Sequence, residues 1–476
     1  MKIPEVVKEK MNKLEQNGYE AYIVGGAVRD SIFGQEPKDY DIFTNASGDN
    51  LKSIFPNGKI LGNKERQEKV FTIIEDDIEI SQYRANGERT EFGNDIHTHL
   101  ETCDLNINAL ASNSDGVLLA KTKTFHDAWE DILNKTLRTP GDPYKRIAED
   151  KLRVFRIIRF ALKYNFKIEN NLLQAIQQTD ISDIAKERIR EEFIKIIQYE
   201  NAIDLLNGTK LLYKLFPDFQ KTHFIDGGKY HNETLYEHLK GAHKIMASLT
   251  PSYLLCISAL FHDYGKISSY QKDENSELTF KGHDKEGEEK VKAILEDLKF
   301  STLEINYICC LIRNHMKPHF FNPKYKTKRN TLLKLFSELK TYNIDIEEFV
   351  LLHYCDHQSN LANERIKFFQ FFIDSYLLKT YKEAILSNRP FDLKDIHISG
   401  TDINELGLKP GRKYKEILNF ILEMTMEGKI KNDKPSQLEL LKKLVEFEIT
   451  LESFTTNELE HNINKIREEY YNNLRK

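Results

Sequence analysis

Long apolar runs are missing from the 476-residue sequence. The longest that we find, residues 253–261, is far shorter than the roughly 20 residues that span a bilayer. The N-terminal segment mixes charges among its apolar positions and has no signal-peptide core. We therefore expect a cytoplasmic protein with no membrane partner.

Cysteine and proline are also scarce. The five cysteines form no CxxC pair, and we expect reduced thiols rather than a disulfide framework. The 12 prolines form no proline-rich linker, and internal repeats and low-complexity segments do not occur. The formal net charge of −5 does not exclude a nucleic-acid partner, because binding depends on local basic patches rather than on the total charge.

The chain changes character along its length. Up to about residue 140, glycines alternate with short runs of β-branched residues, which predicts mixed α/β structure. From Pro143 the strand signals fade and helical periodicity continues almost to the end. We predict an α/β head followed by an all-helical body. The main predicted helices cover 4–17, 149–164, 169–178, 187–199, 234–248, 252–263, 283–298, 303–315 and 455–475.

The first candidate site begins with a glycine pair. Gly25 and Gly26 stand where a predicted strand turns into a helix, and glycines there let backbone N–H groups approach a triphosphate. Arg29, about one turn further on, can reach the same phosphates. No Gly-Lys-Ser/Thr follows, so the segment is not a Walker loop.

Two aspartates follow the glycine pair. Asp39 and Asp41 are two residues apart on a predicted strand, so their carboxylates point to the same face. Two unpaired negative charges so close together are costly, and a pair of Mg²⁺ ions is the usual remedy in phosphoryl-transfer sites. We therefore predict a magnesium site at this strand.

GGxVRD followed by DxDxxT, at 25–44, resembles the opening motif of class II CCA-adding enzymes and bacterial poly(A) polymerases. These are polymerase-β-like nucleotidyltransferases. The resemblance implies that Asp39 and Asp41 hold the catalytic Mg²⁺ and that the glycines and Arg29 hold the triphosphate. Glu79 is a candidate third carboxylate, or equally a surface residue of its strand.

Two further segments match motifs of the same family. In 104–111, the resemblance implies that Asp104 reads the ribose and that Asn108 supports it. Segment 149–160 resembles the nucleobase-selecting motif. Asp150 and Arg153 are three residues apart on a predicted helix and would share a face.

This carboxylate–guanidinium pair matches two of the four nucleobases. A carboxylate accepts from an exocyclic amine and a guanidinium donates to a ring acceptor, which is the pattern that cytosine and adenine offer. A surface ion pair is the alternative. Arg156 lies further along the helix, in a segment (145–167) with eight Lys/Arg against two acids, which is typical of a phosphate-binding surface.

A second candidate site lies in the helical body. His238, His262, Asp263 and Asp356 are separated as histidine and carboxylate ligands of one or two divalent metals can be. His283 and His315 are spaced through the next predicted helices. The H…HD…D pattern resembles the HD phosphohydrolase superfamily, which implies hydrolysis of a phosphate ester or a cyclic phosphate by a divalent metal of unknown identity.

These patterns predict four parts of the chain. They are a nucleotidyltransferase head (1–140), a helical neck that reads the base and binds RNA (141–225), an HD domain (226–375) and a helical C-terminal RNA-binding body (376–476). From Ser399 the chain also resembles the C-terminal element of HD-bearing CCA-adding enzymes.

The resemblance implies template-independent addition of CCA to tRNA 3′ ends from CTP and ATP. Poly(A) or A-only addition to another RNA 3′ end uses the same chemistry and stays open. So does an HD phosphohydrolase with a degenerate head, because Thr102 and Cys103 stand where the family normally carries two arginines. The sequence leaves the oligomeric state open.

Overall fold

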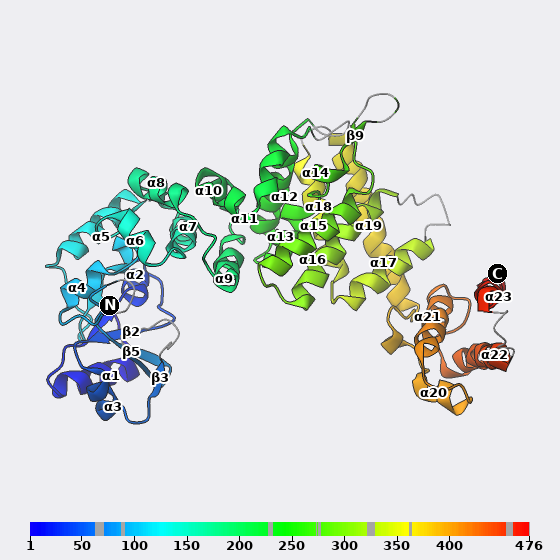
Figure 1. The fold of residues 1–476 in the computed structure, drawn as a ribbon, viewed down its shortest axis with the longest axis horizontal. Helices are drawn as coiled ribbons and strands as arrows, with labels where there is room; N and C mark the ends of the chain where they lie inside the picture. Colours follow the sequence, from blue (N-terminus) through cyan, green and yellow to red (C-terminus); the bar gives the residue numbers. More distant parts are fainter. Residues whose placement is uncertain are drawn as a thin grey trace. The chain divides into compact units, whose positions relative to one another are not determined.

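The computed structural model describes residues 1–61, 71–86, 91–226, 232–272, 274, 278–320, 329–360, 364–453 and 460–475. The chain divides into two compact units, Met1–Gln220 and Lys221–Lys476 (Figure 1). The α/β head and the helical body predicted from the sequence are confirmed.

A six-stranded sheet forms the beginning of the first unit, with the strand order β3-β4-β5-β2-β1-β6. Neighbouring strands run antiparallel except β2 and β5, which are parallel. The strands are β1 (Tyr22–Val24), β2 (Asp41–Thr44), β3 (Lys59–Leu61), β4 (Thr72–Glu75), β5 (Ile78–Gln82) and β6 (Ala111–Ser112).

Both faces of the sheet are covered by apolar side chains, because successive residues of a strand point to opposite faces. Ile23 and Ile42 belong to a core that they share with helices α1, α2 and α3. Val24 and Phe43, the next residue on each strand, belong to a second core shared with α4. These helices are α1 (Glu5–Gln16), α2 (Gly26–Ile32), α3 (Gly48–Ile54) and α4 (Ile96–Glu101).

The rest of the first unit is mostly helical. One short parallel pair joins β7 (Thr136–Leu137) to β8 (Lys167–Ile168), which the fading strand signals did not predict. The other elements are η2 (Asn106–Asn108), α5 (Lys123–Asn134), α6 (Pro143–Glu149), α7 (Arg153–Tyr164), α8 (Asn170–Gln178), α9 (Lys186–Ile196), α10 (Ala202–Gly208), α11 (Leu211–Leu215) and η3 (Pro217–Phe224).

Helices pack on one another through the second unit, and α12 lies against both α13 and α18. The elements up to its long helix are α12 (Leu235–Leu249), α13 (Tyr253–Phe261), α14 (Lys266–Ser269), β9 (Gln271–Lys272), β10 (Leu278–Thr279), α15 (His283–Asp297), α16 (Thr302–Asn314), η4 (Lys317–Phe320), α17 (Arg329–Thr341), α18 (Ile346–Ser359) and α19 (Glu364–Leu386).

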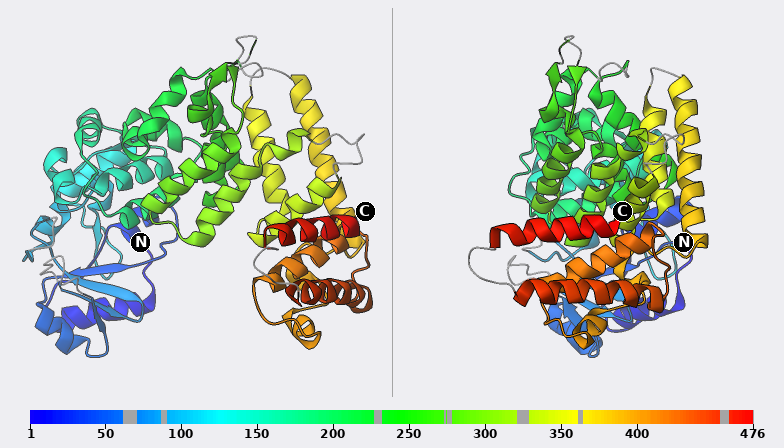
Figure 2. Two further views of the ribbon diagram at one scale, coloured as in Figure 1. Left: turned by 45° about the vertical axis from the view of Figure 1, so that its right-hand side comes forward. Right: turned by 90° about the vertical axis from the view of Figure 1, so that its right-hand side faces the viewer.

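The C-terminal helices, orange to red in Figure 2, form a packed group within this unit. The ring of Phe420 contacts the ring of Tyr471, which ties the last helix to α21. These elements are η6 (Leu393–Asp395), α20 (Gly400–Glu405), α21 (Arg412–Met426), α22 (Lys434–Ser453) and α23 (Glu460–Arg475). Part of the predicted helix 455–475, residues 455–459, lies outside the described residues.

Candidate nucleotide site and metal centre

An acidic edge lies at the start of β2. Asp41 opens the strand and is half-buried, while Asp39 lies exposed just before it. Asp41 stands opposite Glu79 in the parallel pairing of β2 with β5, and such partners point to the same face of a sheet. Carboxylate oxygens are the ligands that Mg²⁺ prefers. The donor set fits Mg²⁺, although the three residues do not form a group whose ligand atoms all lie within 4.8 Å of one another.

The glycine pair forms the turn from β1 into α2. Gly25 has a φ of +82°, a conformation that side chains disfavour. Its N–H donates to the carbonyl of Leu110 at 3.0 Å, which holds the turn against the residue before β6.

Arg29 is buried behind this turn rather than extended into solvent. Its guanidinium donates to Oδ1 of Asn108 at 2.5 Å and pairs with Asp30 at 2.8 Å. It also lies over the rings of Phe160 and Tyr164, 5.0 and 5.3 Å from their centroids. Arg29 therefore connects α2 to the helix that carries the predicted base-reading motif.

The network extends from Asn108 to Arg156. Asn108 donates through Nδ2 to Oδ1 of Asp104 at 2.7 Å. Oδ2 of Asp104 accepts from Nε and Nη2 of Arg156, on α7, at 2.8 and 2.6 Å. Four of the residues predicted to bind the nucleotide thus lie in one hydrogen-bonded chain, Arg29–Asn108–Asp104–Arg156.

This hydrogen-bonded network keeps Asp104 ionised although the Asp104 side chain is buried. Burial alone raises the pKa of a carboxyl group. The Arg156 guanidinium and the amide of Asn108 outweigh burial and hold the pKa of Asp104 well below its ordinary value.

The predicted pairing of Asp150 with Arg153 on one helix face is wrong. Asp150 has extended backbone angles and separates α6 from α7. Its carboxylate accepts from the N–H of Leu152 at 3.1 Å, a capping bond that competes with helix continuation. The side chain of Arg153 turns back, donating to Glu149 at 2.6 Å and to the carbonyl of Arg146 at 2.5 Å.

Asp150 instead pairs with Arg188, which was not among the predicted site residues. Nη1 and Nη2 of Arg188, on α9, donate to the two carboxylate oxygens of Asp150 at 3.2 and 2.8 Å. Burial raises the pKa of Asp150, but the hydrogen bonds from Arg188 lower it by more. The pKa of Asp150 therefore lies below its ordinary value. An arginine in the next helical segment was the only sequence signal.

The basic residues of α7 do not form a row of unpaired charges. Arg159 pairs with Glu192 at 2.7 Å, and Lys163 lies 3.6 Å from Asp30. Together with the partners of Arg153 and Arg156, each arginine and lysine of α7 has a carboxylate neighbour. An RNA phosphate at this face would have to compete with those carboxylates.

Thr102 and Cys103 lie beside this helix. Thr102 is buried, and its carbonyl accepts from Nη2 of Arg153 at 3.3 Å. Burial raises the pKa of the Cys103 thiol to about 11. These positions therefore carry no charge at neutral pH where the resembled family has two arginines.

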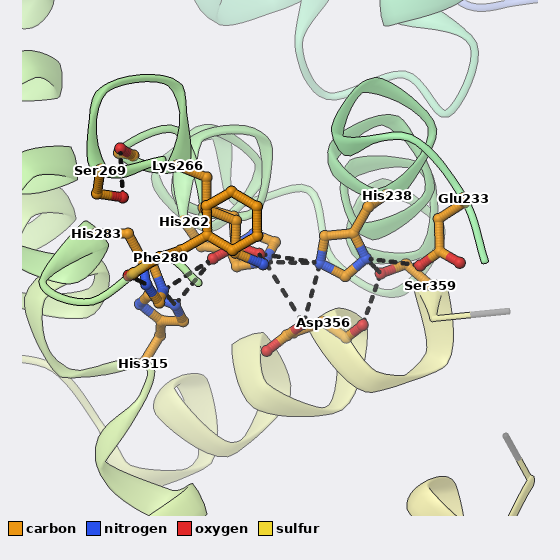
Figure 3. Close-up of polar contacts among 12 residues, drawn as sticks. Glu233, His238, His262, Lys266, Ser269, Phe280, His283, His315, Asp356 and Ser359 are labelled. Carbon is orange, nitrogen blue, oxygen red and sulfur yellow. Dashed lines mark hydrogen bonds and ion pairs between the residues drawn. The ribbon is translucent and has the colours of Figure 1, made fainter. Parts of the chain in front are cut away.

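Six buried histidines and aspartates meet inside the second unit (Figure 3). They come from the start of α15, from within α12 and α18, and from the residues that directly follow α13 and α16. The six are His238, His262, Asp263, His283, His315 and Asp356.

The four predicted metal ligands lie together in this cluster. Nε2 of His238 is 3.1 Å from Nε2 of His262, and Oδ1 of Asp356 lies 3.2 and 3.5 Å from these nitrogens. Oδ2 of Asp263 lies 3.5 and 3.6 Å from the same two nitrogens. The ligand atoms of His238, His262 and Asp356 thus form one group within 4.8 Å of one another, and Asp263 approaches two of them.

The other ring nitrogens of this pair are anchored. Nδ1 of His262 lies 2.9 Å from the carbonyl oxygen of Ala259, which can only accept, so Nδ1 carries the proton. Nδ1 of His238 lies 3.0 Å from the hydroxyl of Ser359, which itself donates to the carbonyl of Asp356. Held in this way by their Nδ1 atoms, both rings direct Nε2 toward the same space, as metal-ligating histidines do.

The carboxylates around His238 favour a positive charge at this site. Burial lowers the pKa of His238, but Asp356 and Glu233 raise it to about 9. A proton thus compensates the buried carboxylates when no cation is bound. The donor set of two imidazoles and two carboxylates fits a divalent metal.

His283 and His315 complete the cluster on the other side of Asp263, as a group of three with that residue. Their spacing is visible in the sequence, but neither histidine was predicted to be a ligand. Two glycines set the place of His283. A Cβ built on Gly265 would overlap the carbonyl oxygen of His283 and the backbone nitrogen of Gly287, so α15 packs directly against the turn after Asp263.

Three family models match the chain. The poly A polymerase head domain matches residues 21–137, the probable RNA and SrmB-binding site of polymerase A matches 165–222, and the HD domain matches 235–342. Among the described residues, no helix is long and apolar enough to cross a membrane.

Relatives align over about half of the chain to nearly all of it. The CCA-adding enzyme of Lactococcus lactis subsp. lactis is 26% identical over 466 residues, which cover 93% of this chain and 99% of that protein. Poly(A) polymerase I of Salmonella typhi is 30% identical over 250 residues, covering 48% and 52%. The crystal structure of a CCA-adding enzyme from Bacillus stearothermophilus in complex with CTP superposes with a TM-score of 0.62 at 19% identity, over 94% of this chain and 100% of that one. At this identity the likeness establishes the fold.

Proposed function

The chain belongs to the nucleotidyltransferase family of the CCA-adding enzymes and poly(A) polymerases, and we propose that it adds C, C and A to tRNA 3′ ends from CTP and ATP. The observation that supports the proposal is the hydrogen-bonded network Arg29–Asn108–Asp104–Arg156. It places four predicted nucleotide ligands in one network within the same fold unit as the acidic edge.

In the proposed reaction, the terminal ribose hydroxyl loses its proton to solvent, and its oxygen forms a bond to the α-phosphorus of the nucleotide while the bond to pyrophosphate breaks. Mg²⁺ held by Asp39 and Asp41, with Glu79 as a third carboxylate, would supply electrostatic stabilisation of the triphosphate. The N–H groups after Gly25 and Gly26 bind and orient the phosphates, and Arg29 supports the turn from behind through its bond to Asn108. Asp104 receives the ribose hydroxyls, and Asn108 and Arg156 fix its carboxylate.

We propose that Asp150 and Arg153 read the base. The carboxylate of Asp150 remains one-third exposed beside Arg188 and accepts from the amine of cytosine or adenine. For Arg153 to donate to the ring acceptor, its guanidinium must exchange its bond to Glu149 for one to the base. Selection by such a site derives from polar groups that remain unpaired when the wrong nucleotide enters.

A second activity is supported by the histidine–aspartate cluster. We propose that His238, His262, Asp263 and Asp356 hold a divalent metal that serves hydrolysis of a phosphate ester or cyclic phosphate. Lys266, whose Nζ lies 2.5 Å from Oδ2 of Asp263, is placed to contact the phosphate beside the metal.

The decisive experiment supplies the protein with Mg²⁺, a tRNA that lacks its CCA end, and each nucleotide singly and in combination. Successive incorporation of C, C and A, resolved on a sequencing gel, supports the proposal. Incorporation of ATP alone into many positions would instead establish a poly(A) polymerase. Hydrolysis of a 2′,3′-cyclic phosphate or phosphomonoester without any incorporation would leave the chain a phosphohydrolase.

A further inference from the structure

A closed ring of hydrogen bonds joins η2 to α5 and to the residue that follows β7. Nδ2 of Asn106, in η2, donates to Oδ2 of Asp131, on α5, at 3.0 Å. Oδ1 of the same carboxylate accepts from Nε of Arg138 at 2.5 Å. The backbone N–H of Asn106 donates to the carbonyl of Arg138 at 2.9 Å and closes the ring.

The ring is buried where it meets η2, since Asp131 is 1% exposed and Asn106 is 3% exposed. Burial raises the pKa of Asp131, and the bonds from Arg138 and Asn106 offset part of this rise. A carboxylate in such a place is stable when its oxygens are bonded, as both are here. Oδ1 of Asn106 is buried and has no hydrogen-bond partner among the described residues. The side chain of Asn106 is therefore held through its bond to Asp131.

The η2 turn also carries the proposed ribose site. Asp104 lies two residues before Asn106, and Asn108 lies two residues after it. The side chains of Asp104 and Asn108 bond to each other at 2.7 Å. A single 3₁₀ turn of three residues is held by few hydrogen bonds of its own. Its position must therefore come from the elements to which it is attached.

Two sets of contacts divide this task. Arg156, from α7, bonds to Oδ2 of Asp104 and orients its carboxylate. The side chain of Arg156 is itself 37% exposed, and a long, partly exposed side chain does not fix the backbone that carries its partner. The ring at Asn106 holds that backbone from α5.

We propose that Asp131 is a positioning residue for ribose selection, because its bond to Asn106 fixes η2 and with it the carboxylate of Asp104. Asp131 is itself buried and bonded on both oxygens, so it acts through Asn106. A carboxylate selects a hydroxyl only while its oxygen stays at hydrogen-bond distance and angle, and a misplacement of about 1 Å can cost roughly 100-fold in rate. The inference rests on the ribose-binding role proposed above for Asp104.

Two adjacent carboxylates provide the test and its matched control. Asp131 and Glu130 both pair with Arg138, at 2.5 and 2.7 Å. Asp131 also bonds to Asn106, whereas Glu130 is exposed. Asp131→Asn keeps the shape of the side chain but turns one acceptor into a donor, so the bond to Asn106 or the bond to Arg138 is lost. Glu130→Gln disturbs Arg138 without that effect on η2.

The measurement is kcat/KM of the full-length protein with CTP and with 2′-deoxy-CTP, on a tRNA that lacks its CCA end. The ratio of the two values reports the contact with the ribose 2′-hydroxyl, because a general loss of active protein lowers both values alike. Asp131→Asn should lower this ratio about tenfold. Glu130→Gln should keep it within about twofold of wild type.

Asn106→Ala removes the other end of the same bond, and it replaces Asp131→Asn if circular dichroism shows that the latter does not fold. It should lower the same ratio. The double variant should lower the ratio no further than the stronger single variant, because both changes break one contact.

The remaining outcomes overturn the inference in distinguishable ways. An unchanged ratio in Asp131→Asn and in Asn106→Ala would leave the ring a purely structural role and keep the proposed function. An equal fall in Glu130→Gln would assign the effect to Arg138 instead of Asn106. Wild-type protein that uses CTP and 2′-deoxy-CTP equally would exclude the ribose role of Asp104 but keep nucleotide addition. Wild-type protein that incorporates neither would exclude the proposed function itself.

Discussion

Arg188 donates two hydrogen bonds to the carboxylate of Asp150 from a helix that lies 38 residues further along the chain. Paired donors in this fork geometry fix a carboxylate in position as well as in charge. Asp150 lies between two helices, where the backbone alone does not determine its side chain. We infer that Arg188 holds Asp150 in the orientation that base selection requires.

Arg188→Ala should therefore impair base selection more than phosphate binding. Loss of a charged hydrogen-bonding pair costs about 1.5–3 kcal/mol, which corresponds to roughly 10–100-fold in kcat/KM. The ratio of kcat/KM for CTP over UTP should fall while the inhibition constant for inorganic triphosphate stays unchanged. Lys195→Ala is the control, because Lys195 is an exposed cation of the same helix that bonds to Glu192. Equal selectivity in both variants would refute the role of Arg188.

Asp41→Asn should abolish nucleotide transfer with little change in melting temperature. The residue is half-buried at the edge of the sheet, and the expected loss of several kcal/mol of transition-state stabilisation lowers kcat by about 10³-fold or more. Glu79→Gln should lower kcat as well, since its side chain shares a face with Asp41. Asp49→Asn, on an exposed carboxylate of α3, should retain full activity. Wild-type incorporation by Asp41→Asn would exclude the proposed magnesium site.

The pair of Asp104 and Arg156 predicts an acid-side loss of stability. The pKa of Asp104 is depressed in the folded protein. A carboxyl group whose pKa is depressed on folding stabilises the folded state. This contribution is fully present at pH values above the pKa of the unfolded state, about 4, and is lost as the pH falls toward the pKa of the folded state. Asp104→Asn should lower the free energy of unfolding by about 3 kcal/mol at pH 7, and by less at pH 3. Denaturant titrations at the two pH values measure this, and an equal difference at both would contradict it.

The two proposed centres should be separable, because their residues belong to different units. Asp356→Asn should remove hydrolysis of a cyclic phosphate and leave CCA addition within about twofold of wild type. Asp41→Asn should have the reverse effect. If the metal is only structural, Asp356→Asn will instead lower the melting temperature and both activities together.

Much of the architecture could be predicted, because residue periodicity depends on short stretches of sequence. Helices α8, α12, α13, α15 and α16 lie within one or two residues of their predicted bounds. The break at Asp150 could not be predicted, because the segment Asp150–Leu152 contains neither glycine nor proline. It depends on a capping bond and on a distant arginine.

The candidate sites show the same limit. The sequence identified Asp41 and Asp263 by their motifs, but not the register that places Glu79 beside Asp41. It likewise showed His283 and His315 without showing that both converge on a single oxygen of Asp263. Such contacts depend on tertiary packing, and no fixed sequence spacing predicts them.

The contact of Gly265 with α15 has a consequence for how this region can vary. Since a methyl group at residue 265 would overlap backbone atoms of His283 and Gly287, no rotamer change can relieve the clash. In a saturation library, position 265 should accept only glycine, whereas Gly411, where a Cβ meets open space, should accept many residues. A compensating second mutation would have to move the whole of α15, and with it one ligand of the cluster. A single substitution of Gly265 should thus destroy the cluster, and only mutation back to glycine should restore it.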